Sequence, residues 1–300
     1  MRQYATEELV LGDILHEKAE SHGSRTFLKL RDGEQSYAEV NEVANRMARG
    51  FVEQGVRQRD HVAVMMGNCA EFLHVIFALA KIGAVAVPIN IAYKGDILQH
   101  VLDNSDTTML VVDASCLDQV APVEGKLAGL RAVVVRNNGS SSEPTVRGLS
   151  KPVLWLRDLL GYGNEAPSVR VRHSDLQAIM FTSGTTGLSK GVMTTHALAL
   201  IDAEDSIRYL AYQPGETVYC PIPLFHAAAL WDGAMVALLL GSPLAIVERF
   251  SASRFWEDVR RFGANVAMGI FSMIPILLKQ PPTPDDRNHP LRAFYVGKSA

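Results

Sequence analysis

The segment between Leu176 and His196 constrains this chain more than any other. An apolar run, 176–181, leads into Thr-Ser-Gly-Thr-Thr-Gly-Leu-Ser-Lys-Gly at 182–191, and a second short run follows. Glycines let backbone N–H groups approach an anion closely, hydroxyls donate hydrogen bonds, and a lysine supplies a positive charge. The segment therefore predicts two strands joined by a loop that holds a polyphosphate.

Two other interpretations of this loop are weaker. The Walker loop of nucleotide kinases requires G-x-x-x-x-G-K-[ST], whereas Ser189 precedes Lys190 here and Gly191 follows it. A flexible turn between two strands is a common use of Gly, Thr and Ser. Several hydroxyls together with a lysine would be unusual in a simple turn, so we favour the phosphate loop.

Composition and charge argue against several classes of protein. The chain has 300 residues, 48% hydrophobic and 20% charged, with a net charge of −3. A nucleic-acid-binding protein would present a basic surface, so no nucleic-acid partner is expected. Cys69, Cys116 and Cys220 are widely spaced without a C-x-x-C pair. They predict neither a disulfide framework nor a zinc site, and a reducing cytoplasm fits them.

No membrane segment is predicted. The N-terminus lacks the apolar core of a signal peptide. The apolar stretches 72–92 and 227–247 are interrupted by charged residues and proline, and a membrane span needs about 20 uninterrupted apolar residues. Both stretches are therefore expected to form buried core.

The remaining pattern predicts an α/β fold. Apolar residues between 40 and 52 follow the i, i+3, i+4, i+7 spacing of one helix face. Strands are expected at 61–66, 84–88, 108–112, 132–136, 217–221, 244–247, 265–268 and 292–296. Helices are expected at 69–82, 97–102, 196–212, 253–262 and 273–279, with another running through Trp231. Such alternation predicts mainly parallel, buried sheets.

The Ser-rich stretch 137–144 has the composition of a linker. We expect it to separate a first α/β lobe, residues 1–145, from a second lobe, residues 146–300, which carries the phosphate loop.

The loop resembles the signature of the adenylate-forming superfamily, which includes acyl-CoA synthetases, luciferases and nonribosomal-peptide adenylation domains. The usual form of that signature is [YF]-T-S-G-T-T-G-x-P-K-G. Phe181 fits the first position, whereas Ser189 replaces the proline and removes a fixed φ. Segments 36–40, 81–90 and 223–226 also resemble family motifs in the expected order. The resemblance covers nearly the whole chain and implies the N-terminal part of the adenylate-forming enzyme fold.

The resemblance implies an acid–thiol ligase. A carboxylate would attack the α-phosphate of ATP to give an acyl-adenylate and pyrophosphate, and CoA would then displace AMP. The protein must neutralise the phosphates, align the carboxylate and exclude water. Mg²⁺ is expected to bridge phosphate oxygens, and no metal-ligating residue is assigned within the chain. The residues expected to bind the nucleotide are Thr182, Ser183, Gly184, Thr185, Thr186, Gly187, Lys190, Gly297, Lys298 and Ser299, with Lys190 also acting in catalysis.

His226 is the residue expected beside the acid's carboxylate. It follows the predicted strand 217–221, and α/β sheets place ligands at the carboxyl ends of their strands. Its role would be orientation or charge stabilisation rather than general base, and an ordinary surface or core histidine is the alternative. The pocket for the acid would be lined by Ala227 and its neighbours, with Trp231 as a wall. Asp232 would face a cationic substrate group or, as we favour, be a solvated helix-cap carboxylate. Segment 247–256 resembles carnitine/crotonobetaine-type CoA ligases.

The chain ends inside a family motif. Gly297 to Ala300 resembles the start of the G-x-[AS]-P adenine-contact segment, and family members continue through a magnesium carboxylate, a hinge and a C-terminal domain. The expectation is therefore a truncated chain that is inactive or very weak alone. A nucleotide- or acyl-binding module without turnover and an ATP-dependent phosphotransferase are the alternatives. The acid, the thiol acceptor and a homo-oligomeric state stay open.

Overall fold

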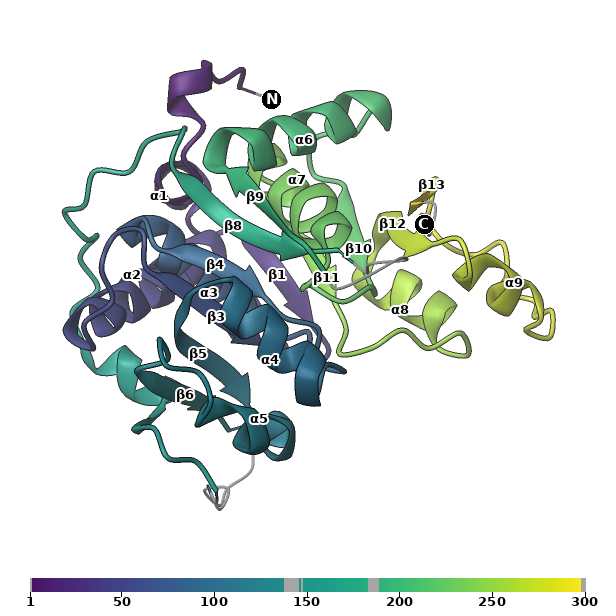
Figure 1. Ribbon diagram of the computed structural model, residues 1–300. Helices are drawn as coiled ribbons and strands as arrows, with labels where there is room; N and C mark the ends of the chain where they lie inside the picture. The colour runs from purple at the N-terminus through teal and green to yellow at the C-terminus, as the bar shows by residue number, and fades with distance from the viewer. Residues whose placement is uncertain (1, 138–145, 147, 183–188, 298–300) are drawn as a thin grey trace.

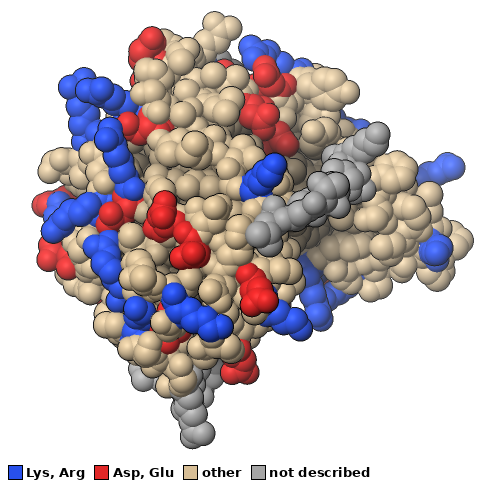
Figure 2. All heavy atoms as spheres, in the orientation of Figure 1, with Lys and Arg blue, Asp and Glu red and all other residues tan. Residues whose placement is uncertain are grey.

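The computed structural model describes residues 2–137, 146, 148–182 and 189–297. It contains two mostly parallel sheets with helices packed against them (Figure 1). The mixed α/β class with mainly parallel sheets, predicted from the alternation of patterns, is confirmed. On the face shown in Figure 2, Lys and Arg side chains are interspersed with Asp and Glu, so this face presents no extended basic surface.

The first sheet has the strand order β7-β6-β5-β3-β4-β8-β9. Each pair is parallel except β8 and β9, which form an antiparallel hairpin. The strands are β3 (His61–Met65), β4 (Val85–Pro88), β5 (Thr107–Asp113), β6 (Ala132–Arg136), β7 (Val153–Trp155), β8 (Leu176–Phe181) and β9 (Gly191–Thr195).

Helices cover both faces of this sheet (Figure 1). The helices are α1 (Leu11–His22), α2 (Tyr37–Glu53), α3 (Ala70–Ile82), α4 (Gly95–Asn104) and α5 (Leu117–Glu124). Because successive strand residues point to opposite faces, Val62 and Val64 pack in the core cluster with α2 and α3, whereas Ala63 and Met65 pack in the cluster with α4 and α5. Burial on both faces explains the continuous apolar runs of these strands.

The second sheet has the strand order β13-β12-β10-β11-β1-β2, parallel throughout except for the β1–β2 hairpin. Its strands are β1 (Thr26–Leu30), β2 (Gly33–Ser36), β10 (Thr217–Cys220), β11 (Leu244–Ile246), β12 (Ala264–Ile270) and β13 (Ala293–Gly297). The associated helical segments are α6 (His196–Tyr209), the π-helix η4 (Ala228–Met235), α7 (Val236–Leu240), α8 (Phe255–Phe262) and α9 (Met273–Leu278).

Each sheet takes strands from both halves of the chain. The hairpin β1–β2 belongs to the sheet whose other strands lie within residues 217–297, and the hairpin β8–β9 belongs to the sheet whose other strands lie within residues 61–155. The hydroxyl of Tyr37, at the start of α2, donates to the carbonyl oxygens of Ala237 and Ser242 at 3.0 and 2.9 Å. Residue 145, where a domain boundary was predicted, therefore does not separate the two sheets.

The two apolar stretches that resemble membrane segments lie in the folded core. Stretch 72–92 forms most of α3 and all of β4, and stretch 227–247 forms η4, α7 and β11. In the part of the chain that the structure describes, no helix is long and apolar enough to cross a membrane.

Candidate functional site

The phosphate-loop segment forms the expected strand–loop–strand hairpin. Phe181 pairs with Gly191 at the loop end of β8 and β9, and the Thr182 N–H donates to the Lys190 carbonyl oxygen at 3.1 Å. A Cβ atom at Gly191 would lie 2.7 Å from Cγ2 of Ile179, so this position requires glycine. The hairpin therefore holds the two ends of the loop together.

The structure describes the base of this loop. Thr182 and Lys190 are brought together there, and both side chains are exposed. The Ser189 carbonyl oxygen lies 3.0 Å from Nε2 of His100, on α4, which fixes the position where the family has proline. The predicted nucleotide contacts Ser183, Gly184, Thr185, Thr186 and Gly187 lie outside the described residues, as do Lys298 and Ser299.

His226 follows β10 in a turn that a buried asparagine holds in place. The Asn68 Oδ1 atom accepts from the Leu224 N–H at 2.7 Å, and the Asn68 amide donates to the carbonyl oxygens of Ile222 and Val247 at 2.9 and 3.0 Å. The His226 N–H closes the turn on the Pro223 carbonyl oxygen at 3.0 Å. Sequence reasoning missed Asn68. A polar residue between the apolar runs 61–66 and 69–82 was the available signal.

The contacts of Asn68 show that the two sheets meet at their carboxyl-terminal edges. Asn68 follows β3 of one sheet, whereas Ile222 and Val247 follow β10 and β11 of the other. Strand β8 runs parallel to β4, and β4 runs parallel to β3, so the phosphate loop leaves the first sheet at this same edge. Gly297, which ends β13, lies at the corresponding edge of the second sheet, opposite Ile270. Ligands of α/β sheets bind at such edges.

A charged network supports the turn that carries Asn68. The Gly67 N–H donates to Asp113 at 2.8 Å, and Arg136 forms ion pairs with Asp113 and Glu71, each at 3.1 Å. Burial is the largest single influence on the pKa of Glu71 and raises it. The charge and the hydrogen bond of Arg136 lower that pKa, and the overall pKa lies below the ordinary value. Sequence reasoning did not identify this network, because its charged residues are far apart in the chain: Glu71 lies in α3, Asp113 in β5 and Arg136 in β6.

The imidazole of His226 is exposed and lies with its ring centre 4.6 Å from that of Phe225. Partial desolvation lowers the pKa of His226 below its ordinary value. This shift favours the neutral imidazole, which has one N–H donor and one acceptor nitrogen.

The helix after His226 carries the predicted acid-binding residues. Ala227 precedes η4, a π-helix, and such segments are frequent at functional sites. Trp231 is half-buried, and its indole N–H is buried without a partner among the described residues. Gly233 packs so closely against the strands that a Cβ atom would lie 3.0 Å from the Met268 sulfur.

The structure corrects the expected position of Asp232. This residue lies inside η4 and is partly buried, so the solvated helix-cap interpretation is wrong. The Ser206 hydroxyl, on α6, donates to its carboxylate at 2.6 Å. Burial is the largest influence on its pKa and raises that pKa to about 6.

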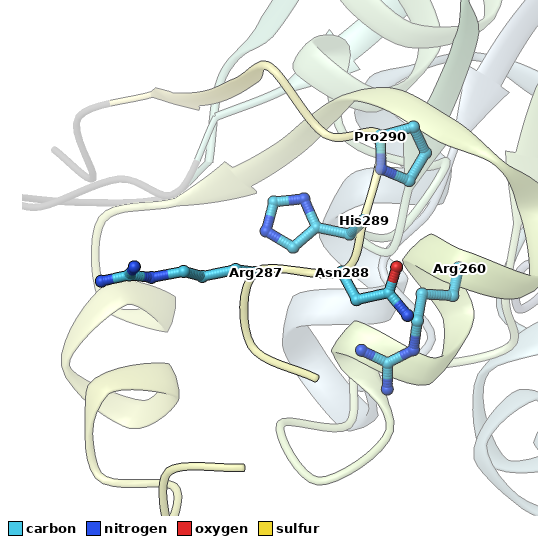
Figure 3. Close-up of a pocket in the computed structure, with 5 residues that line it drawn as sticks. All are labelled: Arg260, Arg287, Asn288, His289 and Pro290. Carbon is cyan, nitrogen blue, oxygen red and sulfur yellow. The ribbon is translucent and has the colours of Figure 1, made fainter. Parts of the chain in front are cut away.

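Two cavities are not lined by Lys190, His226 or Asp232, although Glu71 and Arg136 of the charged network line the smaller one. One, of about 260 Å³, is lined mainly by residues of β6, β7 and the turn after β7. The other, of about 530 Å³, is lined by Arg260, Arg287, Asn288, His289 and Pro290. Figure 3 shows the Arg287 side chain extending away from Arg260, on the opposite side of His289, so the two guanidinium groups do not converge on one ligand position.

The carboxyl-terminal edges of the two sheets carry side chains that can donate hydrogen bonds to an anionic nucleotide. These are the exposed Lys190 ammonium, the Thr182 hydroxyl and the neutral His226 imidazole. Among the described residues, no group of three or more His, Cys, Asp or Glu side chains could hold a metal ion. A magnesium ion bound there would depend chiefly on phosphate oxygens.

Comparison with known proteins finds similarity over most of the chain. Residues 15–300 match the family described as AMP-binding enzyme. The chain is 34% identical over 268 residues to a crotonobetaine/carnitine–CoA ligase of Salmonella typhi, covering 88% of this chain and 51% of that protein. It is 33% identical over 290 residues to the ligase of the same name from Salmonella paratyphi A, covering 94% and 55%. The chain thus spans about half the length of the curated relatives it matches.

A solved structure shows the same fold. A long-chain fatty-acid–CoA ligase from Archaeoglobus fulgidus superposes with a TM-score of 0.84 at 23% identity, covering 98% of this chain and 58% of that one. The family match extends over nearly the whole sequence. This chain belongs to the AMP-binding enzyme family.

Proposed function

We propose that this chain binds ATP and a carboxylic acid at the joined edges of its two sheets, as part of an acid–CoA ligase. One observation carries the proposal. Asn68 joins the carboxyl ends of β3, β10 and β11. This arrangement puts the phosphate-loop hairpin and the His226 turn at one edge, where a nucleotide and an acid can be aligned.

The first step forms the acyl-adenylate. A carboxylate oxygen of the acid attacks the α-phosphorus of ATP, the bond to the β-phosphate oxygen breaks, and pyrophosphate leaves with the electron pair. The loop's N–H groups and hydroxyls, with Lys190, hold the β- and γ-phosphates and stabilise the charge that develops on them. Mg²⁺, when bound to the phosphates, would neutralise part of the same charge.

His226 orients the acid in this step. As a neutral imidazole at the strand edge, it can donate a hydrogen bond to the carboxylate or to an equatorial phosphate oxygen. No proton needs to be removed from a carboxylate before attack, so a general base is not required. In the second step the sulfur of CoA attacks the acyl carbonyl carbon, the bond from that carbon to the phosphate oxygen of AMP breaks, AMP leaves with the electron pair, and the thiol proton passes to solvent.

The two Salmonella relatives suggest the class of acid. Their names specify crotonobetaine and carnitine, which are short carboxylic acids that carry a trimethylammonium group. We propose an acid of this class for the present chain. A cytoplasmic location is also proposed, since Cys69, Cys116 and Cys220 are buried free thiols.

Exchange of radiolabelled pyrophosphate into ATP tests the proposal. It would be measured on residues 1–300 and on these residues joined to the C-terminal half of the Salmonella typhi relative, hereafter the joined protein, with the intact relative as positive control. Exchange by the joined protein that requires added acid supports adenylation. Nucleotide binding without exchange in the joined protein supports a binding module, and a phosphorylated acid formed without AMP supports a phosphotransferase.

A further inference from the structure

A buried carboxylate at the end of β5 contacts the turn that carries Asn68. Asp113 is the last residue of β5, and its side chain is 7% exposed. It directly precedes the short 3-10 helix Ala114–Cys116, where an aspartate commonly accepts from the N–H groups of the helix that it starts. Among these described residues it makes no such bond. Its Oδ2 atom instead accepts from the Gly67 N–H at 2.8 Å.

The other oxygen of this carboxylate is held by the neighbouring strand. Asp113 and Arg136 are paired residues of the parallel strands β5 and β6, so their side chains lie on one face of the sheet. The Arg136 guanidinium contacts Oδ1 of Asp113 and the Glu71 carboxylate, each at 3.1 Å. Glu71 lies in the first turn of α3, which follows the Asn68 turn. Through these two carboxylates, Arg136 holds the chain both before and after Asn68.

Asn68 extends the series of contacts to the second sheet. Gly67, which Asp113 holds, is its neighbour in the chain. The Asn68 side chain accepts from the Leu224 N–H at 2.7 Å, and the His226 N–H closes the same turn on the Pro223 carbonyl oxygen at 3.0 Å. A continuous series of hydrogen bonds and peptide links therefore runs from Asp113 to the turn that presents His226.

A gain in stability is a weak explanation for the buried ion pair of Asp113. Burial removes hydrating water from both charges, and replacing such a pair by apolar residues is often neutral or stabilising. The carboxylate does offer two acceptor oxygens, which hold two donors in fixed directions. An asparagine has only one oxygen, so its NH₂ group would face either the Gly67 N–H or the Arg136 guanidinium.

We propose that Asp113 is a positioning residue for acyl-adenylate formation, because its bond to Gly67 sets the place of Asn68 and, through Asn68, that of the His226 imidazole. This inference rests on the proposed function, in which His226 orients the acid. Asp113 touches neither substrate, and its effect passes through the turn. Its loss should therefore disturb alignment of the acid more than binding of the nucleotide tail by the loop after β8.

Asp60 provides a matched control at the opposite end of β3. Its carboxylate also accepts from a backbone N–H, that of Arg57 at 3.0 Å, and also pairs with an arginine, Arg131 at 2.6 Å. Asp60 directly precedes β3, whereas Gly67 and Asn68 follow that strand. Asp60→Asn therefore disturbs the same kinds of contact while leaving the carboxyl-terminal edge intact.

Pyrophosphate exchange by the joined protein measures the effect on the reaction. We expect Asp113→Asn to lower the maximal exchange rate about tenfold, since small misplacements of reacting groups are costly, while the KM for ATP stays within about twofold. Asp60→Asn should leave both quantities within about twofold of the original. A maximal rate that is equal in the two variants would overturn the proposal.

Arg136→Lys keeps the proposal testable if Asp113→Asn does not fold. A lysine retains the charge but lacks the planar fork that contacts Asp113 and Glu71 together. We expect a smaller fall in the maximal exchange rate, again with little change in the KM for ATP. A rise in the KM for ATP with an unchanged maximal rate would contradict a role in positioning His226.

The position of His226 can also be measured directly, on residues 1–300 and without ATP. Its ring centre lies 4.6 Å from that of Phe225, so the ring current of Phe225 makes the Cε1 proton resonance of His226 sensitive to the position of the imidazole. With histidine isotopically labelled, His226→Gln assigns this resonance by removing it. We expect the resonance to move by more than its linewidth in Asp113→Asn and to stay in place in Asp60→Asn. An unmoved resonance in Asp113→Asn would overturn the proposal.

The two measurements separate this inference from the proposed function. If the unsubstituted joined protein shows no exchange that depends on added acid, the proposed function fails, and the histidine resonance still decides whether Asp113 positions His226. Acid-dependent exchange together with an unmoved resonance would leave the ligase activity standing and remove the role of Asp113.

Discussion

The Asn68 side chain accepts a hydrogen bond from the Leu224 N–H at 2.7 Å across the junction of the two sheets. Asn68 follows a strand of one sheet, and Leu224 lies in the turn after a strand of the other. Both carbonyl contacts of the Asn68 amide reach the second sheet as well. This single side chain therefore aligns the edge that carries the phosphate loop with the turn that presents His226.

Replacing Asn68 by alanine should destabilise the fold and misplace His226. The change leaves the buried Leu224 N–H and two carbonyl oxygens without their partner, and we expect a loss of about 2–4 kcal/mol in the free energy of unfolding. Urea denaturation of residues 1–300 measures it. Asn104→Ala, at the exposed end of α4, is the control and should stay within about 0.5 kcal/mol of the original protein. An equal effect of the two substitutions would show that Asn68 does not organise the junction.

Lys190→Ala should weaken nucleotide binding without unfolding the protein. The side chain is exposed, so its loss removes a charge and leaves the core intact. We expect at least a tenfold rise in the dissociation constant for a nonhydrolysable ATP analogue and no change in the thermal midpoint. Lys126→Ala, which removes an exposed charge after α5, controls for net charge. Unchanged nucleotide affinity in Lys190→Ala would exclude this lysine from the site.

His226→Ala should lower the rate of adenylation in the joined protein more than the affinity for nucleotide. The neutral imidazole acts on the acid and the developing charge rather than on the phosphate tail, so we expect a rate loss of about 10²-fold or more. His226→Gln, which keeps a hydrogen-bond donor, should recover part of that rate. An unchanged rate in His226→Ala would assign this residue a structural role.

Asp232→Asn should stabilise the protein at high pH and not at low pH. The pKa of Asp232 is raised from its ordinary value of 3.8 to about 6, so the folded state disfavours its charged form. The resulting cost is absent below pH 3.8 and complete above pH 6. After allowance for solvent screening we expect Asn to add about 1 kcal/mol at pH 8 and nothing near pH 3.5. Unfolding midpoints at the two pH values measure this difference, and a gain of equal size at both would contradict the buried-charge explanation.

The local elements of the fold could be predicted from the sequence. Strand β5 and helix α3 read as apolar runs because both of their faces are buried. The hairpin β8–β9 was predictable because its loop has a distinctive composition. Helix α1 was missed because its apolar face is interrupted by charged residues such as Lys18, which is buried nonetheless. Strand β2 was missed because Gly33–Ser36 is polar and partly exposed.

Long-range relationships could not be predicted, because no local pattern records them. Leu28 pairs with Leu244, more than 200 residues away, and this pairing moves β1 and β2 into the second sheet. The residues of the candidate site also fall into those that a local motif predicts and those that only long-range contacts reveal. The phosphate loop and His226 were recognisable as contiguous motifs. Asn68 and the partner of Asp232, Ser206, became visible as contacts between distant segments.

The most direct test of the account is a crystal structure of residues 1–300 with a nonhydrolysable ATP analogue. The account predicts that the β- and γ-phosphates lie within hydrogen-bond distance of the backbone and hydroxyls of segment 182–191, with the Lys190 ammonium beside them. A triphosphate bound elsewhere, with this hairpin free of ligand, would contradict it.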